Sequence, residues 1–333
     1  MNMKSPAFRT VSVVLVLLMV VWLICRQVFF QRQTSDLNKS PTVQFVGNAN
    51  HSIIHFDFRN GRIIVPVIVD NKAYDAALDT GTPVTAIVNH GSYDSALILP
   101  RIVGNLQPPY DGGDPRPIGS ELVHKLQIGD FIAKEVPVRR YDDNARDLFH
   151  GSILGNNVMQ KVTLTIDLAR HIITIASPDS EYSPSRTTGW DEVLSFKSQS
   201  DLTPTDKWVL IGGITAGQKT LFVFDTGNGE SVLSIIDRQL DRRLLRIQGQ
   251  PLKDEPQIIK PILWSLGKVQ LNTPLLSVPG KKSPFSGLIG TMFLCGYKVA
   301  IDYPNHKLYL HRYRSAERMT GFAETIRETL FDN

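Results

Sequence analysis

The sequence contains the triplet Asp-Thr-Gly twice, at residues 79–81 and 225–227, and each copy lies between two apolar runs. A carboxylate at the end of an apolar strand is costly to desolvate unless it has a partner. A single triplet of this kind carries little information, because the same three residues form ordinary Asx turns. Two copies in the same setting predict one site with two carboxylates, Asp79 and Asp225.

The segments before the two triplets also match each other without gaps. Aligning Asp79 with Asp225 gives an offset of 225 − 79 = 146, and this offset places residues 65–72 on residues 211–218. Both segments have the pattern of a strand, a tight turn and a second strand. The match predicts equivalent hairpins that lead into the two carboxylates.

A second pair of motifs follows the triplets. Residues 152–155 and 287–290 both end in an apolar pair followed by glycine, and the next aspartate comes 12 residues after that glycine in each copy (167 − 155 = 12; 302 − 290 = 12). His171 and His306 follow these aspartates by four residues, and we interpret them as hairpin-turn residues. A repeat of about 130 to 150 residues is too long for a solenoid unit and indicates a duplicated domain.

With these motifs in register, the chain resembles the pepsin and retropepsin-like aspartic proteases over roughly residues 50–314. In that family each lobe supplies one Asp-Thr-Gly, and a later apolar-apolar-Gly segment supports it. Residues 152–159 are especially similar to the retroviral form, in which two separate chains each bring one aspartate. The resemblance therefore implies an all-β, bilobal fold of two retropepsin-like β-barrel lobes, and a monomer with an internal pseudo-dimer.

The resemblance also implies an aspartic-type endopeptidase with Asp79 and Asp225 as the catalytic pair. Two carboxylates held close together retain one proton, so that one is a base toward water and the other an acid toward the scissile carbonyl. This chemistry requires no metal and no other cofactor. The residues that the resemblance assigns to support of the pair are Thr80, Gly81, Thr82, Thr226, Gly227, Asn228, Gly155 and Gly290.

Position three after each aspartate differs between the two copies. Thr82 can donate its hydroxyl to the Asp79 carboxylate and thereby favour the ionised form. Asn228 holds the matching position, where we expect its amide to donate to Asp225. Pepsins have Ser or Thr there and retroviral enzymes have Ala, so this departure leaves the pH optimum open.

Residues 107–117 are rich in Pro, Gly and Asp and are too polar for a core. The resemblance makes them the flap of the first lobe, a hairpin over the cleft in which Tyr110, Gly112 and Gly113 contact the substrate. The counterpart in the second lobe is residues 248–254. A plain surface loop is the alternative for both segments.

An apolar run at residues 11–25, extended by residues 28–30, has a length between those of a signal-peptide core and a spanning helix. The residues at its end are bulky, whereas a cleavage site needs small ones. We therefore expect an uncleaved transmembrane signal anchor at residues 11–30. A cleaved signal peptide and lipid attachment at Cys25 are the alternatives.

Composition sets the remaining boundaries. The polar composition of residues 31–50 predicts a stalk, and the Ser- and Pro-rich residues 179–189 predict a linker. After Tyr313, apolar residues at helical spacing predict an amphipathic helix. The expected organisation is a tail at 1–10, the transmembrane signal anchor at 11–30, the stalk at 31–50, the first lobe at 51–178, the linker at 179–189, the second lobe at 190–314 and the C-terminal helix at 315–333.

The composition also excludes some classes of protein. With 42% hydrophobic and 20% charged residues, the chain has the balance of a globular protein with a core. The net charge of +4 is modest, and the absence of a basic run interleaved with aromatics argues against nucleic-acid binding. One of the two cysteines, Cys25, lies in the apolar run, so we expect no disulfide with Cys295.

Together these features predict a membrane-anchored aspartic endopeptidase whose catalytic part faces away from the cytoplasm, in a periplasmic, extracellular or lumenal space. Its partners would be a peptide or protein substrate and, through the N-terminal helix, the membrane. The alternative is a non-catalytic peptide-binding pseudoprotease that uses the same cleft. A processing enzyme dedicated to one membrane-proximal substrate is a third possibility. The presence of both aspartates favours an enzyme.

Overall fold

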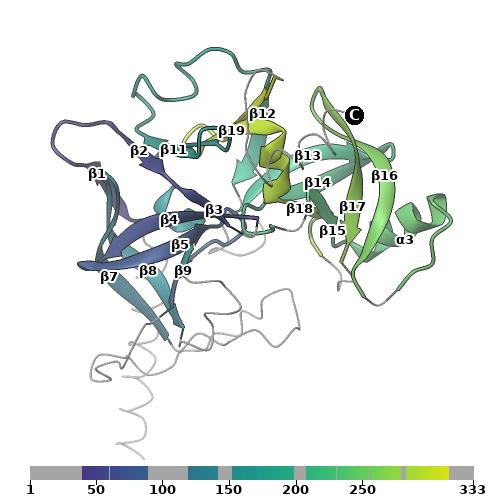
Figure 1. Cartoon of the computed structure of the whole chain (residues 1–333), viewed down its shortest axis with the longest axis horizontal. Helices are drawn as coiled ribbons and strands as arrows, with labels where there is room; N and C mark the ends of the chain where they lie inside the picture. The colour runs from purple at the N-terminus through teal and green to yellow at the C-terminus, as the bar shows by residue number, and fades with distance from the viewer. Residues whose placement is uncertain are drawn as a thin grey trace, which may run out of the picture. The chain divides into compact units, whose positions relative to one another are not determined.

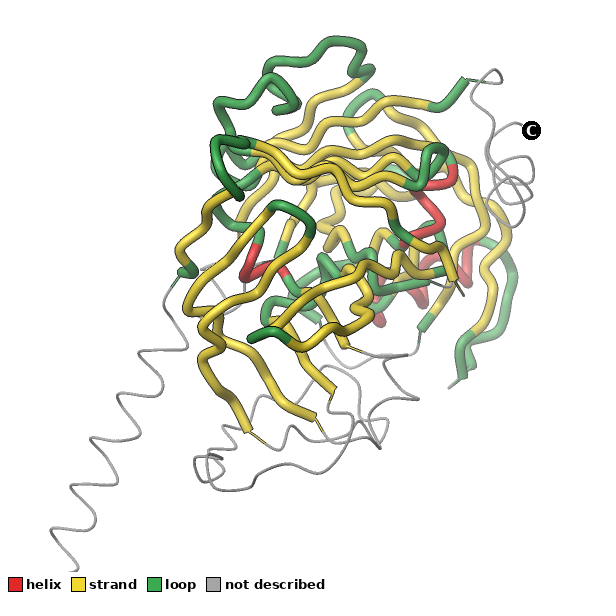
Figure 2. Tube along the Cα trace, turned by 60° about the vertical axis from the view of Figure 1, so that its left-hand side comes forward, coloured by secondary structure: helices red, strands yellow, loops and turns green. Residues whose placement is uncertain are grey.

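Strands make up most of the folded chain (Figure 2). The structure, a computed structural model, describes residues 40–59, 61–88, 119–141, 152–198, 208–229, 231–253, 255–278 and 283–314. The first lobe contains β1 (Thr42–Phe45), β3 (Asp57–Arg59), β4 (Arg62–Val69), β5 (Lys72–Leu78), β6 (Thr85–Val88), β7 (Gly119–Ile128), β8 (Phe131–Tyr141), β9 (Ser152–Leu154) and the 3-10 helix η3 (Asn156–Val158). The second lobe contains β13 (Val209–Thr215), β14 (Gln218–Phe224), β15 (Leu233–Ile235), α3 (Arg238–Ile247), β16 (Gln257–Leu266), β17 (Val269–Ser277), β18 (Gly287–Ile289) and the 3-10 helix η4 (Thr291–Cys295).

The two hairpins at the 146-residue offset form as the sequence predicts. β4 pairs with β5, and β13 pairs with β14, both antiparallel. The two-residue turns between them have positive φ angles, 45° and 70° at Asp70 and Asn71 and 46° and 77° at Ala216 and Gly217. Turns of this hand match the twist of the flanking strands and fix the register of a tight hairpin.

Each lobe closes its strands into a ring of six. In the first lobe the hydrogen-bonded order is β4, β5, β9, β6, β8 and β7, which pairs again with β4. In the second lobe it is β13, β14, β18, β15, β17 and β16, which pairs again with β13 (Figure 1). The same order in both rings places the strands before the two Asp-Thr-Gly triplets, β5 and β14, at equivalent positions.

A further sheet is built from both halves of the chain, and the sequence did not predict it. Its strands are, in order, β12 (Glu192–Ser198), β20 (Lys307–Arg312), β19 (Tyr297–Asp302), β10 (Thr163–Asp167), β11 (Ile172–Ala176) and β2 (His51–His55). The β10–β11 and β19–β20 hairpins meet through an antiparallel β10–β19 pairing. His171 and His306 lie in their turns with φ of 54° and 52°, so their prediction as turn residues is confirmed.

Alternation along β14 separates the core from the site. Phe222 and Phe224 belong to the main hydrophobic core, where their rings meet Trp264 and Phe293 edge to face. Val223 points to the opposite face, because successive side chains of a strand alternate. Continuing this alternation places Asp225 on the same side as Val223, away from the core.

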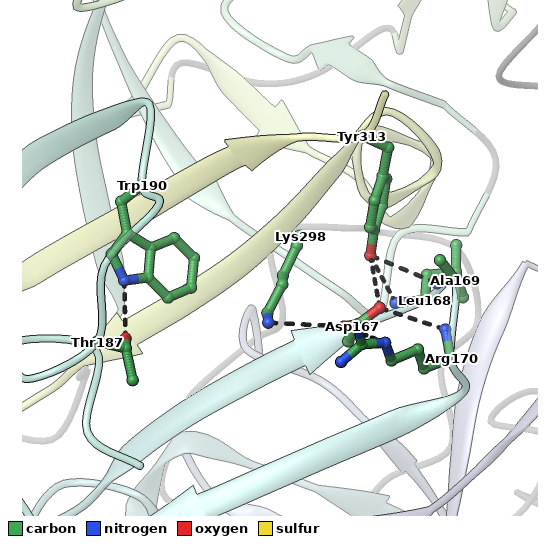
Figure 3. Close-up of polar contacts among 8 residues, drawn as sticks. All are labelled: Asp167, Leu168, Ala169, Arg170, Thr187, Trp190, Lys298 and Tyr313. Carbon is green, nitrogen blue, oxygen red and sulfur yellow. Dashed lines mark hydrogen bonds and ion pairs between the residues drawn. The ribbon is translucent and has the colours of Figure 1, made fainter. Parts of the chain in front are cut away.

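A buried carboxylate ties the chain that leaves the shared sheet back onto that sheet (Figure 3). Asp167 accepts a hydrogen bond from the Tyr313 hydroxyl at 3.3 Å, and its other oxygen lies 3.6 Å from Nζ of Lys298. The Tyr313 oxygen in turn accepts from the backbone N–H of Leu168 at 2.8 Å. Burial, followed by the charge of Asp167, raises the pKa of Tyr313 well above its usual range. These contacts hold the chain after β20 against the turn after β10.

The stalk predicted at residues 31–50 differs from the structure at its end. Residues 42–45 form β1, which pairs antiparallel with β8 of the first lobe. Phe45 packs against Phe131, with ring centroids 5.7 Å apart. The polar composition of the segment hides these contacts, because the alternate residues that face solvent dominate it.

The sequence analysis also missed α3. Asp237 caps its N-terminus by accepting from the backbone N–H groups of Gln239 and Leu240, as an N-cap carboxylate does. The face formed by Leu240, Leu244 and Leu245 is buried. Within residues 248–254, predicted as the second flap, residues 248–250 end the helix and the described residues lead on toward β16.

Several predictions concern residues outside the described ranges. These are the signal anchor at 11–30, the first flap with Tyr110, Gly112 and Gly113, and the C-terminal helix at 315–333. In the part of the chain that the structure describes, no helix has the length and apolar character needed to span a membrane.

Candidate active site

The two aspartates of the triplets lie directly after strands at matched positions of the repeat. Asp79 follows β5 and Asp225 follows β14. The backbone N–H of Asp79 donates to the carbonyl of Leu154 at 3.0 Å, and that of Asp225 donates to the carbonyl of Ile289 at 2.9 Å. The apolar-apolar-Gly segments therefore hold the backbone of both aspartates.

The triplet glycines bring the two carboxylates together. A Cβ atom added to Gly81 would overlap the carboxylate of Asp225, and one added to Gly227 would overlap that of Asp79. Each carboxylate thus lies against the glycine of the opposite loop. Only a residue without a side chain permits this approach.

Thr80 and Thr226 fasten the two loops to each other. The Thr80 hydroxyl donates to the carbonyl of Phe224 at 2.7 Å, and the Thr226 hydroxyl donates to the carbonyl of Leu78 at 2.8 Å. Each hydroxyl oxygen also accepts from the backbone N–H of the other threonine at 3.0 Å. Both side chains are buried, so these polar groups have no water to replace a lost partner.

The two carboxylates have different donors. Asp79 accepts from the backbone N–H of Gly81 at 2.8 Å and from the Thr82 hydroxyl at 2.7 Å. Asp225 accepts from the backbone N–H of Gly227 at 3.0 Å. Among the side chains that the structure describes, the Thr82 hydroxyl is thus a donor to Asp79 that Asp225 lacks.

The sequence analysis expects the side-chain amide of Asn228 to donate to Asp225, but the amide has other partners in the structure. Its Nδ2 donates to the Ser234 hydroxyl at 2.9 Å, and Ser234 lies 2.7 Å from the Ser231 hydroxyl. The two serine hydroxyls are thus the partners of this amide within the described residues. The predicted side-chain donation from Asn228 to Asp225 is therefore wrong.

Asp225 binds its proton more tightly than an isolated aspartate does. Its burial, the nearby charge of Asp79 and a hydrogen bond with the Asp79 carboxyl raise the pKa of Asp225 well above its usual range. The backbone N–H groups of Gly227 and Asn228 act in the opposite direction with smaller effect. A half-buried, coupled pair of this kind keeps one proton where isolated aspartates have lost theirs.

Gly155 and Gly290 allow the supporting segments to touch the aspartate loops. A Cβ on Gly155 would meet the backbone of Thr82 and Val84 at 2.7 to 2.8 Å. A Cβ on Gly290 would overlap the carbonyl of Ser231. Both glycines are buried, and the close backbone contact gives each a physical role in supporting the pair.

The structure adds supporting residues that the sequence analysis missed. Asn156 donates its amide to the carbonyl of Thr80, and Thr291 donates its hydroxyl to the carbonyl of Thr226. Tyr303, from the turn after β19, donates its hydroxyl to Oδ1 of Asn156. Asn156 and Thr291 directly follow the two supporting glycines, so their matched positions in the repeat were the available signal.

No protein-family profile matches the chain, and no curated protein sequence matches it. Solved structures do match. The chain has the bilobal, all-β fold of the pepsin-like aspartic proteinases, which confirms the fold class and the two barrel-like lobes. The crystal structure of the aspartic proteinase from Irpex lacteus is similar with a TM-score of 0.50 and 12% identity, over 83% of this chain and 99% of that one. At this identity the likeness concerns the fold.

Proposed function

We propose that the chain is an aspartic-type endopeptidase that hydrolyses peptide bonds with a water activated between Asp79 and Asp225. The observation that supports this most directly is the pair itself. Each carboxylate lies against the glycine of the other loop, and the pKa of Asp225 is raised. One acid and one base at neighbouring positions are what hydrolysis by a bound water requires.

The raised pKa of Asp225 assigns the two roles. Asp79 is the base and takes a proton from the water as the water oxygen bonds to the scissile carbonyl carbon. Asp225 gives its proton to the carbonyl oxygen, which forms a neutral diol. When the C–N bond breaks, Asp79 returns a proton to the leaving amine and Asp225 recovers one from a diol hydroxyl. Both carboxyls then have their original protonation.

The substrate in this proposal is an extended peptide or protein segment, bound by strand-like pairing. The apolar N-terminal run supports anchoring of the chain in a membrane with the catalytic part extracytoplasmic. The two matched lobes support a monomer with an internal pseudo-dimer. The orientation is tested by adding a protease to intact cells. The catalytic part should be digested, and its protection from the protease would contradict the proposed orientation.

The test of the reaction uses the full chain in detergent, incubated with a diverse peptide mixture at several pH values and read by mass spectrometry. Asp79→Asn and Asp225→Asn should each remove nearly all cleavage, and the double variant should be little worse, because residues that act as a unit are non-additive. Asp130→Asn, an exposed aspartate in the β7–β8 turn, is the control and should cleave normally.

Peptide binding separates the enzyme from the alternative. Asn is isosteric with Asp, so both single variants should fold and keep binding a peptide with a statine-type hydroxyl in place of the scissile bond. Wild-type protein that binds such peptides without cutting any of the mixture would support the pseudoprotease instead. Substantial activity in either single variant would contradict a shared site.

A further inference from the structure

A tryptophan of the second lobe is hydrogen-bonded to the aspartate loop of the first. Trp208 directly precedes β13, and its indole Nε1 donates to the carbonyl oxygen of Gly81 at 2.8 Å. Gly81 is the residue whose backbone N–H donates to Asp79. One indole therefore fixes the peptide group next to the one that holds the carboxylate.

The indole is itself held by packing on its own lobe. Its ring meets Phe285 edge to face, with centroids 5.3 Å apart and an interplanar angle of 73°. Phe285 belongs to a small apolar cluster with Leu210 and Val223, and half-buried Trp208 packs against that cluster. Val223 lies two residues before Asp225 on the same side of β14, so this cluster extends the face that leads to Asp225.

The matching position in the other half of the repeat is not a tryptophan. The offset of 146 places Trp208 on residue 62 (208 − 146 = 62), which is Arg62. Its neighbour Gly61 packs against the backbone of Gly229, beyond the second triplet. The threonine contacts between the loops are made by the same residue type on both sides, whereas an indole faces the loop of Asp79 and an arginine holds the matching position.

We propose that Trp208 is a positioning residue for the reaction: it holds the Gly81 carbonyl from the opposite lobe and thereby keeps the Asp79 loop aligned with Asp225. This inference rests on the proposed function. A donor anchored on a rigid apolar cluster restricts the loop before substrate arrives, and such preorganisation lowers the barrier without adding affinity. The role is expected in kcat rather than in KM.

The chain offers a matched pair of variants. Trp208→Phe removes the indole N–H and keeps a ring against Phe285. Trp264→Phe removes an equivalent bond in the same lobe, because Nε1 of Trp264 donates to the Thr273 hydroxyl at 3.0 Å inside the core. The two variants lose the same chemical group, and only one of them touches the aspartate loop.

The expected result is a split between turnover and stability. Trp208→Phe should lower kcat about five- to tenfold, the size of one lost hydrogen bond, with KM changed by less than about twofold. Trp264→Phe should lower the melting temperature and leave kcat and KM near the wild-type values. Equal effects of both variants on kcat, or an effect of Trp208→Phe on KM or stability alone, would overturn the positioning role.

A measurement without turnover separates this inference from the proposed function. In the full chain labelled with 15N at tryptophan, addition of a statine-containing peptide inhibitor should shift the indole N–H resonance of Trp208, identified by its loss in Trp208→Phe. The Trp264 resonance should stay in place. A Trp208 shift in protein that cleaves nothing would contradict the proposed function alone. Cleavage by Trp208→Phe at the wild-type kcat would contradict the positioning role alone.

Discussion

Thr80 and Thr226 exchange hydrogen bonds across the two lobes, with each backbone N–H donating to the other residue's hydroxyl oxygen at 3.0 Å. Each hydroxyl then donates to the carbonyl at the end of the opposite strand. The exchange works only if both loops are in place together. It therefore couples the folding of one lobe to the geometry of the carboxylate in the other.

This exchange predicts a cost for Thr226→Val. Valine keeps the shape of threonine, and leaves the N–H of Thr80 and the carbonyl of Leu78 buried without partners. We expect the free energy of unfolding to fall by about 2–4 kcal/mol, measured by urea denaturation. Thr174→Val on β11 is the control, because the Thr174 hydroxyl bonds to none of the described residues, and should change stability by less than about 0.5 kcal/mol. Similar losses in both variants would show that the exchange contributes little.

The raised pKa of Asp225 predicts how stability depends on pH. A raised folded-state pKa means that the folded state binds this proton more tightly than the unfolded state does. The resulting stabilisation is fully present below about pH 4, the ordinary pKa of aspartate, and is lost as pH rises through the folded-state value. Asp225→Asn has no such group, so its stability relative to the wild type should increase from pH 4 to pH 8.

Urea denaturation at each pH measures this difference. Asp130→Asn is the control, since Asp130 is exposed and replacing it should alter the free energy of unfolding little across the range. A difference between Asp225→Asn and wild type that does not change with pH would contradict the placement of the proton on a buried pair.

The approach of the two loops predicts the effect of one added methyl group. Gly227→Ala places a Cβ onto the Asp79 carboxylate, so the pair must separate and we expect activity to fall at least about 100-fold. Gly212→Ala on β13 is the control, because a Cβ there meets nothing within 4 Å. Peptide cleavage and melting temperature are measured for both. Full activity in Gly227→Ala would mean that the loops are further apart than described.

The sequence predicted the features that occur in both copies of the repeat. The two hairpins, the turn histidines and the adjoining aspartate loops all have matched motifs at fixed spacing, so each copy supports the other. The features that it missed have only one copy or depend on long-range contact. Tyr303 reaches Asn156 across 147 residues, and no local pattern marks Tyr303. The apolar face of α3 is only three leucines among charged residues.

The shared sheet was missed for a related reason. Its strands come from both halves of the chain, and the pattern of burial in a strand does not predict which strand it pairs with.

Asn228 shows that matched positions in the repeat do not always make matched contacts. It occupies the place of Thr82, yet its side-chain amide donates to Ser234 and the expected side-chain hydrogen bond to Asp225 does not form.

The difference between Thr82 and Asn228 predicts an asymmetric effect on turnover. Thr82→Val removes the hydroxyl that donates to Asp79 at 2.7 Å and so loosens the position of that carboxylate. Losing one such bond, worth about 1 kcal/mol, should lower kcat about fivefold in the peptide-cleavage assay. Asn228→Ala is the matched control, because its amide is bound to Ser234 and kcat should change little. If both variants lowered kcat equally, Asp79 and Asp225 would be supported alike, and the asymmetry between the two loops would have no part in the reaction.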